Sequence, residues 1–375
     1  MGRNRILLAA CVITFAALLF ASSAAAGGAP DKKLQRQLNA IVNAKGGPPG
    51  IGLLISRGRQ QEFLAAGTAG GDLRPAPSLH FRIASVSKGF NAYLAAKLVG
   101  FGLPFETTLG QWIPGILPAG EAVTMRQLLQ HTSGLPDYIR APAFVEQFIA
   151  DPSRYFSPTD LTAFVRDQPL EFLPGSRYHY SDTDNIAAAL IEEMATGLPY
   201  EDLLGKFVLG PLKMRDTSLP LTAKMPRPFM HGYEVEPGKK PEDVSELINP
   251  AGAWASGGIV STPLDLSAFV RSYVRTMLLK TKGLEGRFRP GSSSPPGPGK
   301  NSAGLGIFRY RTGCGRVYGH TGSFPGYRVF IAASADGKRS VVFVANAQIV
   351  PGSGSQKVAK AITKLQASAV CRALD

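Results

Sequence analysis

Ser85 and Lys88 form a Ser-x-x-Lys motif whose residue types and spacing suit acyl transfer. The motif lies in Phe81-Arg-Ile-Ala-Ser85-Val-Ser-Lys88-Gly, and an apolar-periodic run follows it as far as Val99. A serine in the first turn of a helix and a lysine three residues later lie on one face. The serine oxygen is then close to the positive helix end and to an amine that can share its proton. By itself, however, the tetrapeptide is more often a helix N-cap with a solvated lysine.

Tyr180-Ser181-Asp182 supplies a second chemical group ahead of a segment rich in isoleucine and alanine. A tyrosine beside a lysine ammonium loses its proton more easily than one in water. As a phenolate, Tyr180 would accept the Ser85 proton, and as a phenol it would return a proton to the leaving group. The alternative is a core or surface tyrosine beside a helix cap.

Gly319-His320-Thr321-Gly322-Ser323 precedes a strand expected over 326–333. A strand edge that carries histidine and threonine can hold a substrate by backbone pairing and hydroxyl contacts. The N–H group of Ser323 would join that of Ser85 in binding the developing oxyanion. The alternative is a turn whose glycines serve backbone geometry alone.

His131-Thr132-Ser133-Gly134 is interpreted as structural, closing a helix and bracing the site, with His131 as general base the less favoured alternative. No G-x-S-x-G sequence occurs, which disfavours an α/β-hydrolase with a nucleophile elbow. No His-Glu-x-x-His or comparable ligand spacing is present either. We therefore expect no metal and no organic cofactor. The histidines considered are His80, His131, His179, His231 and His320.

Taken in order, these segments resemble the class C β-lactamase and D-alanyl-D-alanine carboxypeptidase family. The ordered set is Ser-x-x-Lys, His-Thr-Ser-Gly, Tyr-Ser-x after Pro174-Gly175, and Gly-His-Thr-Gly before a strand. The segment 252–262 is similar to another stretch of the family, so the resemblance covers nearly all of the chain after residue 26. His320 is more similar to the D,D-carboxypeptidase branch, because the β-lactamases usually carry lysine there.

The resemblance implies a role for each matching residue. Ser85 is the acylated nucleophile, and Lys88 is its activating partner. Tyr180 is the proton shuttle, and His320 gives electrostatic support near it. Thr321 holds the substrate beside the oxyanion hole described above.

Asp182 departs from the family pattern, which often has asparagine two residues after the tyrosine. An amide both donates and accepts hydrogen bonds, whereas an ionised carboxylate only accepts. Asp182 is therefore expected to hold Lys88 charged more firmly and to recognise the side-chain amide of a peptide or β-lactam substrate less well. This favours esters or other acyl donors somewhat. Arg309 is a candidate anchor for a peptide carboxylate, although strand alternation equally allows it to point to solvent.

Hydrophobic patterning predicts a mixed α/β fold of the α+β type. Strand-like segments occur near both ends of the chain, and residues 86–215 are mostly helices and loops. Helices are expected over 31–43 and from Val358 to Ala369, and Asp336-Gly337 predicts a hairpin turn. The expected strands are 50–56, 62–67, 304–311, 326–333 and 340–345.

These elements predict an antiparallel sheet that is closed by the two termini, flanked by N- and C-terminal helices, and accompanied by an all-helical lobe. We expect a single β-lactamase-like catalytic domain over residues 27–375. Its α/β lobe would span about 27–85 and 255–375, and its helical lobe about 86–254. The resemblance implies the same fold, with the site between the lobes. Residues 289–300, rich in proline, glycine and serine, are predicted to form a mobile surface loop.

Residues 1–26 have the features of a secretory signal peptide: a basic start, an apolar run over 6–21 and a small-x-small site ending at Ala26. We therefore expect a secreted or periplasmic protein. Leu8-Ala-Ala-Cys11 is similar to a lipoprotein box, but the apolar run continues past the cysteine, so a lipid anchor is not expected. In an exported chain Cys314 and Cys371 are expected to form a disulfide, with two free thiols as the alternative.

The net charge of the 375-residue chain is +14. In an exported protein this charge allows weak contact with anionic wall polymers or membranes, although a merely soluble basic surface is the simpler interpretation. No basic run is interleaved with aromatic residues, so no nucleic-acid partner is expected. We expect a monomer that binds a small-molecule or peptide substrate.

The sequence therefore predicts an exported serine hydrolase that works through an acyl-enzyme. A D-Ala-D-Ala peptide of the cell wall is the favoured substrate, which would make the chain a D-alanyl-D-alanine carboxypeptidase of the penicillin-binding type. β-Lactamase and esterase activities are close alternatives. An alternative of another class is a protein that binds wall peptides or β-lactams without turnover.

Overall fold

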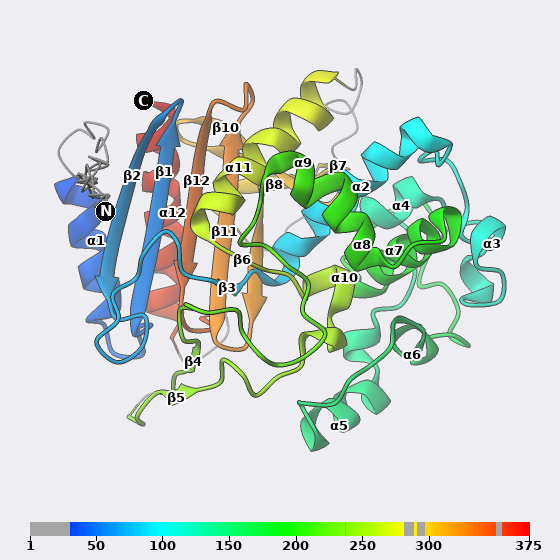
Figure 1. Ribbon diagram of the computed structural model, residues 1–375, viewed down its shortest axis with the longest axis horizontal. Helices are drawn as coiled ribbons and strands as arrows, with labels where there is room; N and C mark the ends of the chain where they lie inside the picture. The colour runs from blue at the N-terminus through cyan, green and yellow to red at the C-terminus, as the bar shows by residue number, and fades with distance from the viewer. Residues whose placement is uncertain (1–30, 237, 281–288, 291–296, 350–354) are drawn as a thin grey trace, which may run out of the picture.

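The computed structural model describes residues 31–236, 238–280, 289–290, 297–349 and 355–375. Its main feature is an eight-stranded antiparallel sheet in the order β2-β1-β12-β11-β10-β9-β8-β7 (Figure 1). The predicted α/β class, with one antiparallel sheet built from both ends of the chain, is confirmed. The strands are β1 Gly50–Arg57, β2 Gln60–Gly67, β7 Arg289–Pro290, β8 Lys300–Ala303, β9 Phe308–Thr312, β10 Gly315–Phe324, β11 Tyr327–Ser334 and β12 Arg339–Ala345.

Two layers of helix cover the faces of the sheet (Figure 1). Helices α1 (Lys32–Val42) and α12 (Gln356–Leu374) pack on one face, where Leu38 and Ile362 join Phe343 in one core. Helix α11 (Pro263–Val274) packs on the other face, where its apolar side chains meet Val342 and Ile331. Because side chains alternate along a strand, β11 and β12 contribute to both cores.

The helical region beside the sheet is built around two nearly buried helices, α2 (Ser87–Leu98) and α7 (Asp182–Thr196). Local signals fix several ends: Ser157 forms a capping box at the start of α6, and Gly197 ends α7 in the left-handed conformation. The other helices are α3 Leu109–Trp112, α4 Met125–Leu129, α5 Pro142–Ala150, α6 Pro158–Ala163, α8 Tyr200–Leu204, α9 Gly210–Leu212 and α10 Trp254–Gly257.

Two expectations differ from the structure. The Gly-His-Thr-Gly segment does not merely precede a strand, because it forms the second half of β10 and pairs with β11. Its glycines weakened the strand signal in the sequence. The region expected as a loop contributes Arg289–Pro290 to β7 and Lys300 to β8, whereas its residues 291–296 lie outside the described residues. The expected signal peptide, with Cys11, also lies outside them.

Cys314 and Cys371 are joined in the structure, with their Cα atoms 5.2 Å apart. The bond links the turn between β9 and β10 to the last helix. Among the described residues, no helix is both long and apolar enough to cross a membrane.

Replacing Cys371 with serine is expected to lower the free energy of unfolding by about 4 kcal/mol, because the bond closes a 57-residue separation in the unfolded chain. Urea unfolding of the wild type and the variant, with and without reductant, measures the effect. Reductant should move the wild-type midpoint to that of Cys371→Ser and leave the variant unchanged. An unchanged wild-type midpoint would mean that the two thiols are unpaired in the protein.

Candidate active site

The segment that carries Ser85 is held by strand pairing just before it. Strand β3 (Phe81–Arg82) pairs with β6 (Val260–Ser261), and the Ile83 N–H group continues the pairing to the Ile259 carbonyl. Ser85 then lies in a 3-10 turn, Ala84–Val86, directly before α2, rather than in the first turn of an α-helix. Ala84 has φ = +52°, a conformation that residues other than glycine rarely adopt. Such strain is typical of functional sites.

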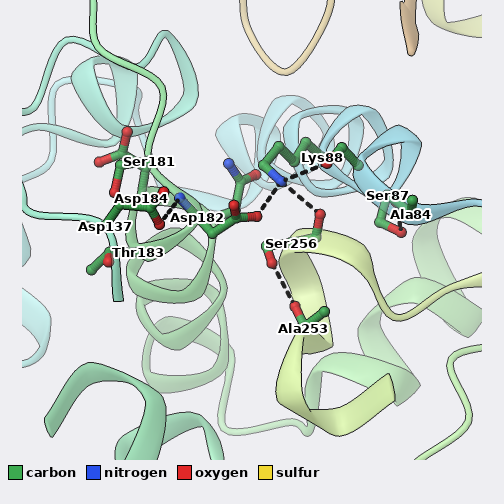
Figure 2. A network of polar contacts seen from close by, with 12 residues as sticks. Ala84, Ser87, Lys88, Asp137, Ser181, Asp182, Thr183, Asp184, Ala253 and Ser256 are labelled. Atoms are coloured by element: carbon green, nitrogen blue, oxygen red, sulfur yellow. Dashed lines mark hydrogen bonds and ion pairs between the residues drawn. The ribbon is translucent and has the colours of Figure 1, made fainter. Parts of the chain in front are cut away.

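Lys88 is fully buried and uses its ammonium in three contacts. Its Nζ atom donates to the Ser85 hydroxyl at 3.3 Å, to Asp182 Oδ1 at 2.5 Å and to the Ser256 carbonyl at 2.8 Å. Figure 2 shows Lys88 extending from α2 between Asp182 at the start of α7 and Ser256 of α10. Three donors therefore meet three acceptors, which fixes the amine beside the nucleophile.

Tyr180 lies against the same ammonium, with Lys88 Nζ 4.9 Å from the centre of its ring. Its hydroxyl is buried and has no well-aligned hydrogen-bond partner among the described residues. Burial, followed by the charge of Asp182, raises the pKa of Tyr180 well above its usual value, although the Ser85 hydroxyl acts in the opposite direction. The expectation of an easily ionised tyrosine is therefore wrong. Asp182 offsets the Lys88 charge, and burial disfavours the phenolate.

His131 stacks on the Tyr180 ring, with ring centres 4.4 Å apart and planes inclined by 32°. Its Nδ1 atom lies 2.9 Å from Asp184 Oδ2, and the Ser133 hydroxyl donates to the other oxygen of that carboxyl. Burial lowers the pKa of His131 and raises that of Asp184, so it favours the neutral form of each group. These contacts hold the tyrosine in place, and they agree with a structural role for His131.

Asp137 is a second carboxylate at the site and was not identified from the sequence. Its Oδ1 atom accepts from the Asp182 N–H group at 2.9 Å, and Arg140 lies 3.6 Å from its Oδ2 atom. Burial, and then repulsion from Asp182, raises the pKa of Asp137 to about 7. No spacing rule connects Asp137 to Asp182, since the two meet only in the folded chain.

Replacing Asp137 with asparagine is expected to change how stability depends on pH. The pKa of Asp137 rises from 3.8 to about 7 on folding, so its contribution to stability is full below pH 4 and is lost as pH rises to 7. Lys88 and Arg140 favour the ionised form and limit the effect. Asparagine keeps the acceptor for the Asp182 N–H group and does not titrate.

The stability of Asp137→Asn relative to the wild type should therefore rise by about 1 kcal/mol or more between pH 5 and pH 8. Urea unfolding at several pH values measures this difference. Asp160→Asn, at an exposed helix start, is the control for a change of one carboxylate. A difference that stays constant between pH 5 and pH 8 would contradict the raised pKa of Asp137.

Strand β10 brings His320, Thr321 and Ser323 to the site. His320 is fully buried, and burial lowers its pKa to about 3, so its ring is neutral at pH 7. Its Nδ1 atom donates to the Thr321 carbonyl, and its Nε2 atom has no hydrogen-bond partner among the described residues. The ring centre lies 6.3 Å from that of Tyr180. Because the His320 ring carries no net charge, it can act on charges near Tyr180 only through its dipole.

A cavity of about 400 Å³ is lined by Ser85, Tyr180, Asp182, Ser256 and Ser323 together. β10 lies directly against the segment that precedes the nucleophile, because a Cβ atom at residue 322 would be 2.3 Å from the Ile83 carbonyl oxygen. Only glycine fits at residue 322. This close approach brings the backbone of Ser323 near the segment that carries Ser85. Lys88 and His320 are buried behind this surface, and Thr321 is nearly so.

The arrangement places a hydroxyl, an ammonium and a phenol together, and these are groups that serine acylation can use. Among the described residues, no group of His, Cys, Asp and Glu side chains is placed to hold a metal ion.

Comparison with known proteins agrees with this geometry. Residues 31–361 match the family described as Beta-lactamase. The chain belongs to this family. Proteins of the family include peptidases, amidases and esterases that act through a serine, so the family assignment supports the serine hydrolase prediction at this general level.

Two curated relatives and one solved structure illustrate the range of this β-lactamase family. Penicillin-binding protein 4* of Bacillus subtilis (strain 168) is 26% identical over 71% of this chain and 60% of its own length. The D-alanyl-D-alanine-carboxypeptidase/endopeptidase AmpH of Escherichia coli (strain K12) is 29% identical over 61% of this chain and 58% of its own length. The chain thus spans less than two thirds of either relative.

A D-stereospecific amidohydrolase from Streptomyces sp. is similar in structure, with a TM-score of 0.76 and 31% identity over 88% of this chain and 98% of that one. The family therefore contains proteins named for peptide, amide and β-lactam chemistry. Within it, the branch that contains penicillin-binding proteins and D,D-carboxypeptidases fits this chain.

Proposed function

We propose that this chain hydrolyses amide or ester acyl donors through an acyl-enzyme on Ser85. The observation that carries the proposal is the convergence of Ser85, Lys88 and Tyr180 with Ser323 at one cavity. Each group is of the type that serine acylation requires: a nucleophile, a cation, a proton carrier and an N–H donor for the oxyanion.

The raised pKa of Tyr180 determines the proton path that we propose. The Ser85 oxygen attacks the carbonyl carbon, and its proton passes to the Tyr180 oxygen as the phenol proton passes to the leaving nitrogen or oxygen. No free phenolate forms, because burial disfavours it. The ammonium of Lys88 and the N–H groups of Ser85 and Ser323 stabilise the negative charge that develops. Water then releases the acyl group by the same relay in reverse.

The charged side chains that line the cavity favour some candidate substrates over others. Among the described residues that line it, Asp182 is the only charged side chain, and no lysine or arginine is present. A D-Ala-D-Ala peptide carries a carboxylate beside its scissile bond, and the described lining offers no free cation to bind it, since the Lys88 ammonium is already paired with Asp182. We therefore place amides, esters and peptides with an uncharged leaving group first. The D-stereospecific amidohydrolase supports the D configuration for the acyl group.

D-alanyl-D-alanine carboxypeptidase activity is the second candidate. The similarity to penicillin-binding protein 4* and to AmpH favours it, as does histidine in Gly-His-Thr-Gly. β-Lactamase activity and binding of β-lactams without turnover share the same first step, acylation of Ser85.

Side-by-side turnover measurements test this order. The panel is a D-amino acid amide, a short-chain aryl ester, a D-Ala-D-Ala peptide and a cephalosporin. We expect the amide and the ester to give the highest kcat/KM. Highest turnover of the D-Ala-D-Ala peptide would assign carboxypeptidase activity instead. No turnover, together with a lasting penicillin adduct on Ser85 by mass spectrometry, would make the chain a binder.

We also propose that residues 1–26 direct export and are removed, so that the Cys314–Cys371 bond forms in an oxidising compartment. N-terminal sequencing of the protein recovered outside the cytoplasm should begin at residue 27. A mature protein that still begins at Met1 would contradict this proposal.

A further inference from the structure

The cavity beside Ser85 is apolar on the side away from the nucleophile. Its polar groups gather around Ser85 and Asp182, whereas the remaining wall is formed mainly by aliphatic and aromatic side chains. These come from four separate segments: the turn before α5, α5 itself, the loop before Asn249 and the end of β10. We call this wall the apolar subsite, and its residues are Ile139, Phe144, Val145, Phe148, Ile248 and Phe324.

The base of the apolar subsite is fixed before any substrate binds. The Phe144 ring packs edge-on against Tyr138 at 5.1 Å and against Phe164 at 5.4 Å, and the side chain is nearly buried. The Tyr138 hydroxyl in turn donates to the Gly252 carbonyl at 2.7 Å, across the cavity floor. A wall braced in this way keeps its shape, so it can select by size.

The rim of the apolar subsite, in contrast, is exposed to water. Ile139 is 40% exposed and Val145 is 38% exposed, and both line the cavity. When an apolar ligand covers side chains that are exposed together at the edge of a concave site, the burial of apolar surface favours binding. The cavity volume of about 400 Å³ is also within the range of about 300–1,000 Å³ that is usual for small-molecule sites.

The chemistry of the wall defines the group that it would hold. Two polar side chains, Tyr138 and Asn249, line the cavity next to the apolar subsite, but both bond to the protein itself: the Tyr138 hydroxyl donates to the Gly252 carbonyl, and the Asn249 amide donates to the Ser153 carbonyl and accepts from the Ala251 N–H group. A carboxylate, a hydroxyl or an amide placed there would lose its hydration without compensation. An aryl or large alkyl group would instead bury its surface against the Phe148 and Ile248 side chains.

We propose that the apolar subsite binds a large apolar side group of the acyl donor, so that the enzyme prefers aryl and branched or long alkyl groups over the methyl group of alanine. The inference rests on the proposed acylation of Ser85 and adds its substrate class. It identifies Val145 and Ile139 as residues that determine specificity by contact with that group.

Hydrolysis of the p-nitroanilides of D-alanine, D-leucine and D-phenylalanine tests the proposal with the full-length mature protein. Burial of a large apolar side chain is expected to raise kcat/KM roughly 10- to 100-fold from D-alanine to D-phenylalanine. Val145→Asp, which places a charge in the wall, should reduce that ratio about tenfold or more. Ile149→Asp is the matched control, because Ile149 lies on the same helix, is 71% exposed and is not among the described residues of the cavity wall.

A fluorophosphonate probe separates the two proposals. If the probe fails to label Ser85, the proposed acyl-enzyme mechanism is wrong. If it labels Ser85 but the three anilides react at equal rates, the apolar subsite does not select the side group. Equal loss of selectivity in Val145→Asp and Ile149→Asp would show a general effect of charge rather than contact with the substrate. Circular dichroism confirms that both variants are folded.

Discussion

Ser85→Ala is expected to lower kcat/KM for every acyl donor by about 10⁴-fold or more, since the removal of a serine nucleophile typically leaves only the effect of binding and of the oxyanion donors. The variant should keep its fold, because alanine fits the 3-10 turn that Ser85 occupies. Loss of activity should therefore appear in kcat, with little change in the melting temperature. Labelling by a fluorophosphonate probe should disappear as well.

Ser176→Ala is the control for this experiment, since Ser176 is exposed and is not a residue of the cavity wall. It should retain both turnover and labelling. Hydrolysis of test esters by Ser85→Ala at the wild-type rate would contradict the assignment of the nucleophile. A labelled peptide that excludes Ser85 would contradict it independently of any substrate.

Lys88→Met is expected to have the second largest effect, with acylation slowed at least 10³-fold. The variant removes the cation that lies 3.3 Å from the Ser85 hydroxyl. It also leaves Asp182, whose side chain is 11% exposed, without its ionic partner. Breaking a buried pair by removing one member typically costs about 3–5 kcal/mol of stability. Stopped-flow acylation and urea unfolding measure the two losses separately.

The double variant Lys88→Met/Asp182→Asn distinguishes catalysis from stability. Asparagine removes the unpaired charge, so the double variant should recover much of the lost stability while acylation remains slow. Asp182→Asn alone should also lose stability, because it removes the ionic partner of the fully buried Lys88 ammonium, but the loss should be smaller since the amide oxygen and the Ser256 carbonyl still accept from that ammonium. Recovery of fast acylation in the double variant would mean that Lys88 acts only by holding the structure together.

Local sequence signals predicted two hairpins of the sheet and the positions of the first and last helices. The Asp336-Gly337 turn aligns β11 with β12, and Gly337 has φ = +63° as such a turn requires. The first hairpin was expected from the two apolar segments 50–56 and 62–67 on either side of the turn at Gly58. Each of these features is determined by a few residues that are adjacent in the sequence, so it can be predicted without knowledge of the folded structure.

The site was predicted less completely, because its electrostatics depend on residues far apart in the chain. The Ser-x-x-Lys motif located Ser85 and Lys88, and the Tyr-Ser-Asp segment located Tyr180. The ionisation of Tyr180, in contrast, depends on burial and on carboxylates such as Asp137, which is brought near by the loop before α5. No periodicity in the sequence contains that information.

The pairing of β1 with a distant strand limits when this protein can fold. One neighbour of β1, the strand β2, is local, but the other is β12, and the Gly50 N–H group bonds to Asn346 across 296 residues. The pairing that joins the N-terminal hairpin to the rest of the sheet therefore forms only after nearly the whole polypeptide has been synthesised. Pairing over such a distance is slow. A nascent chain of this topology therefore exposes unpaired strand edges until β12 is available, and chaperones can bind such surfaces during that time.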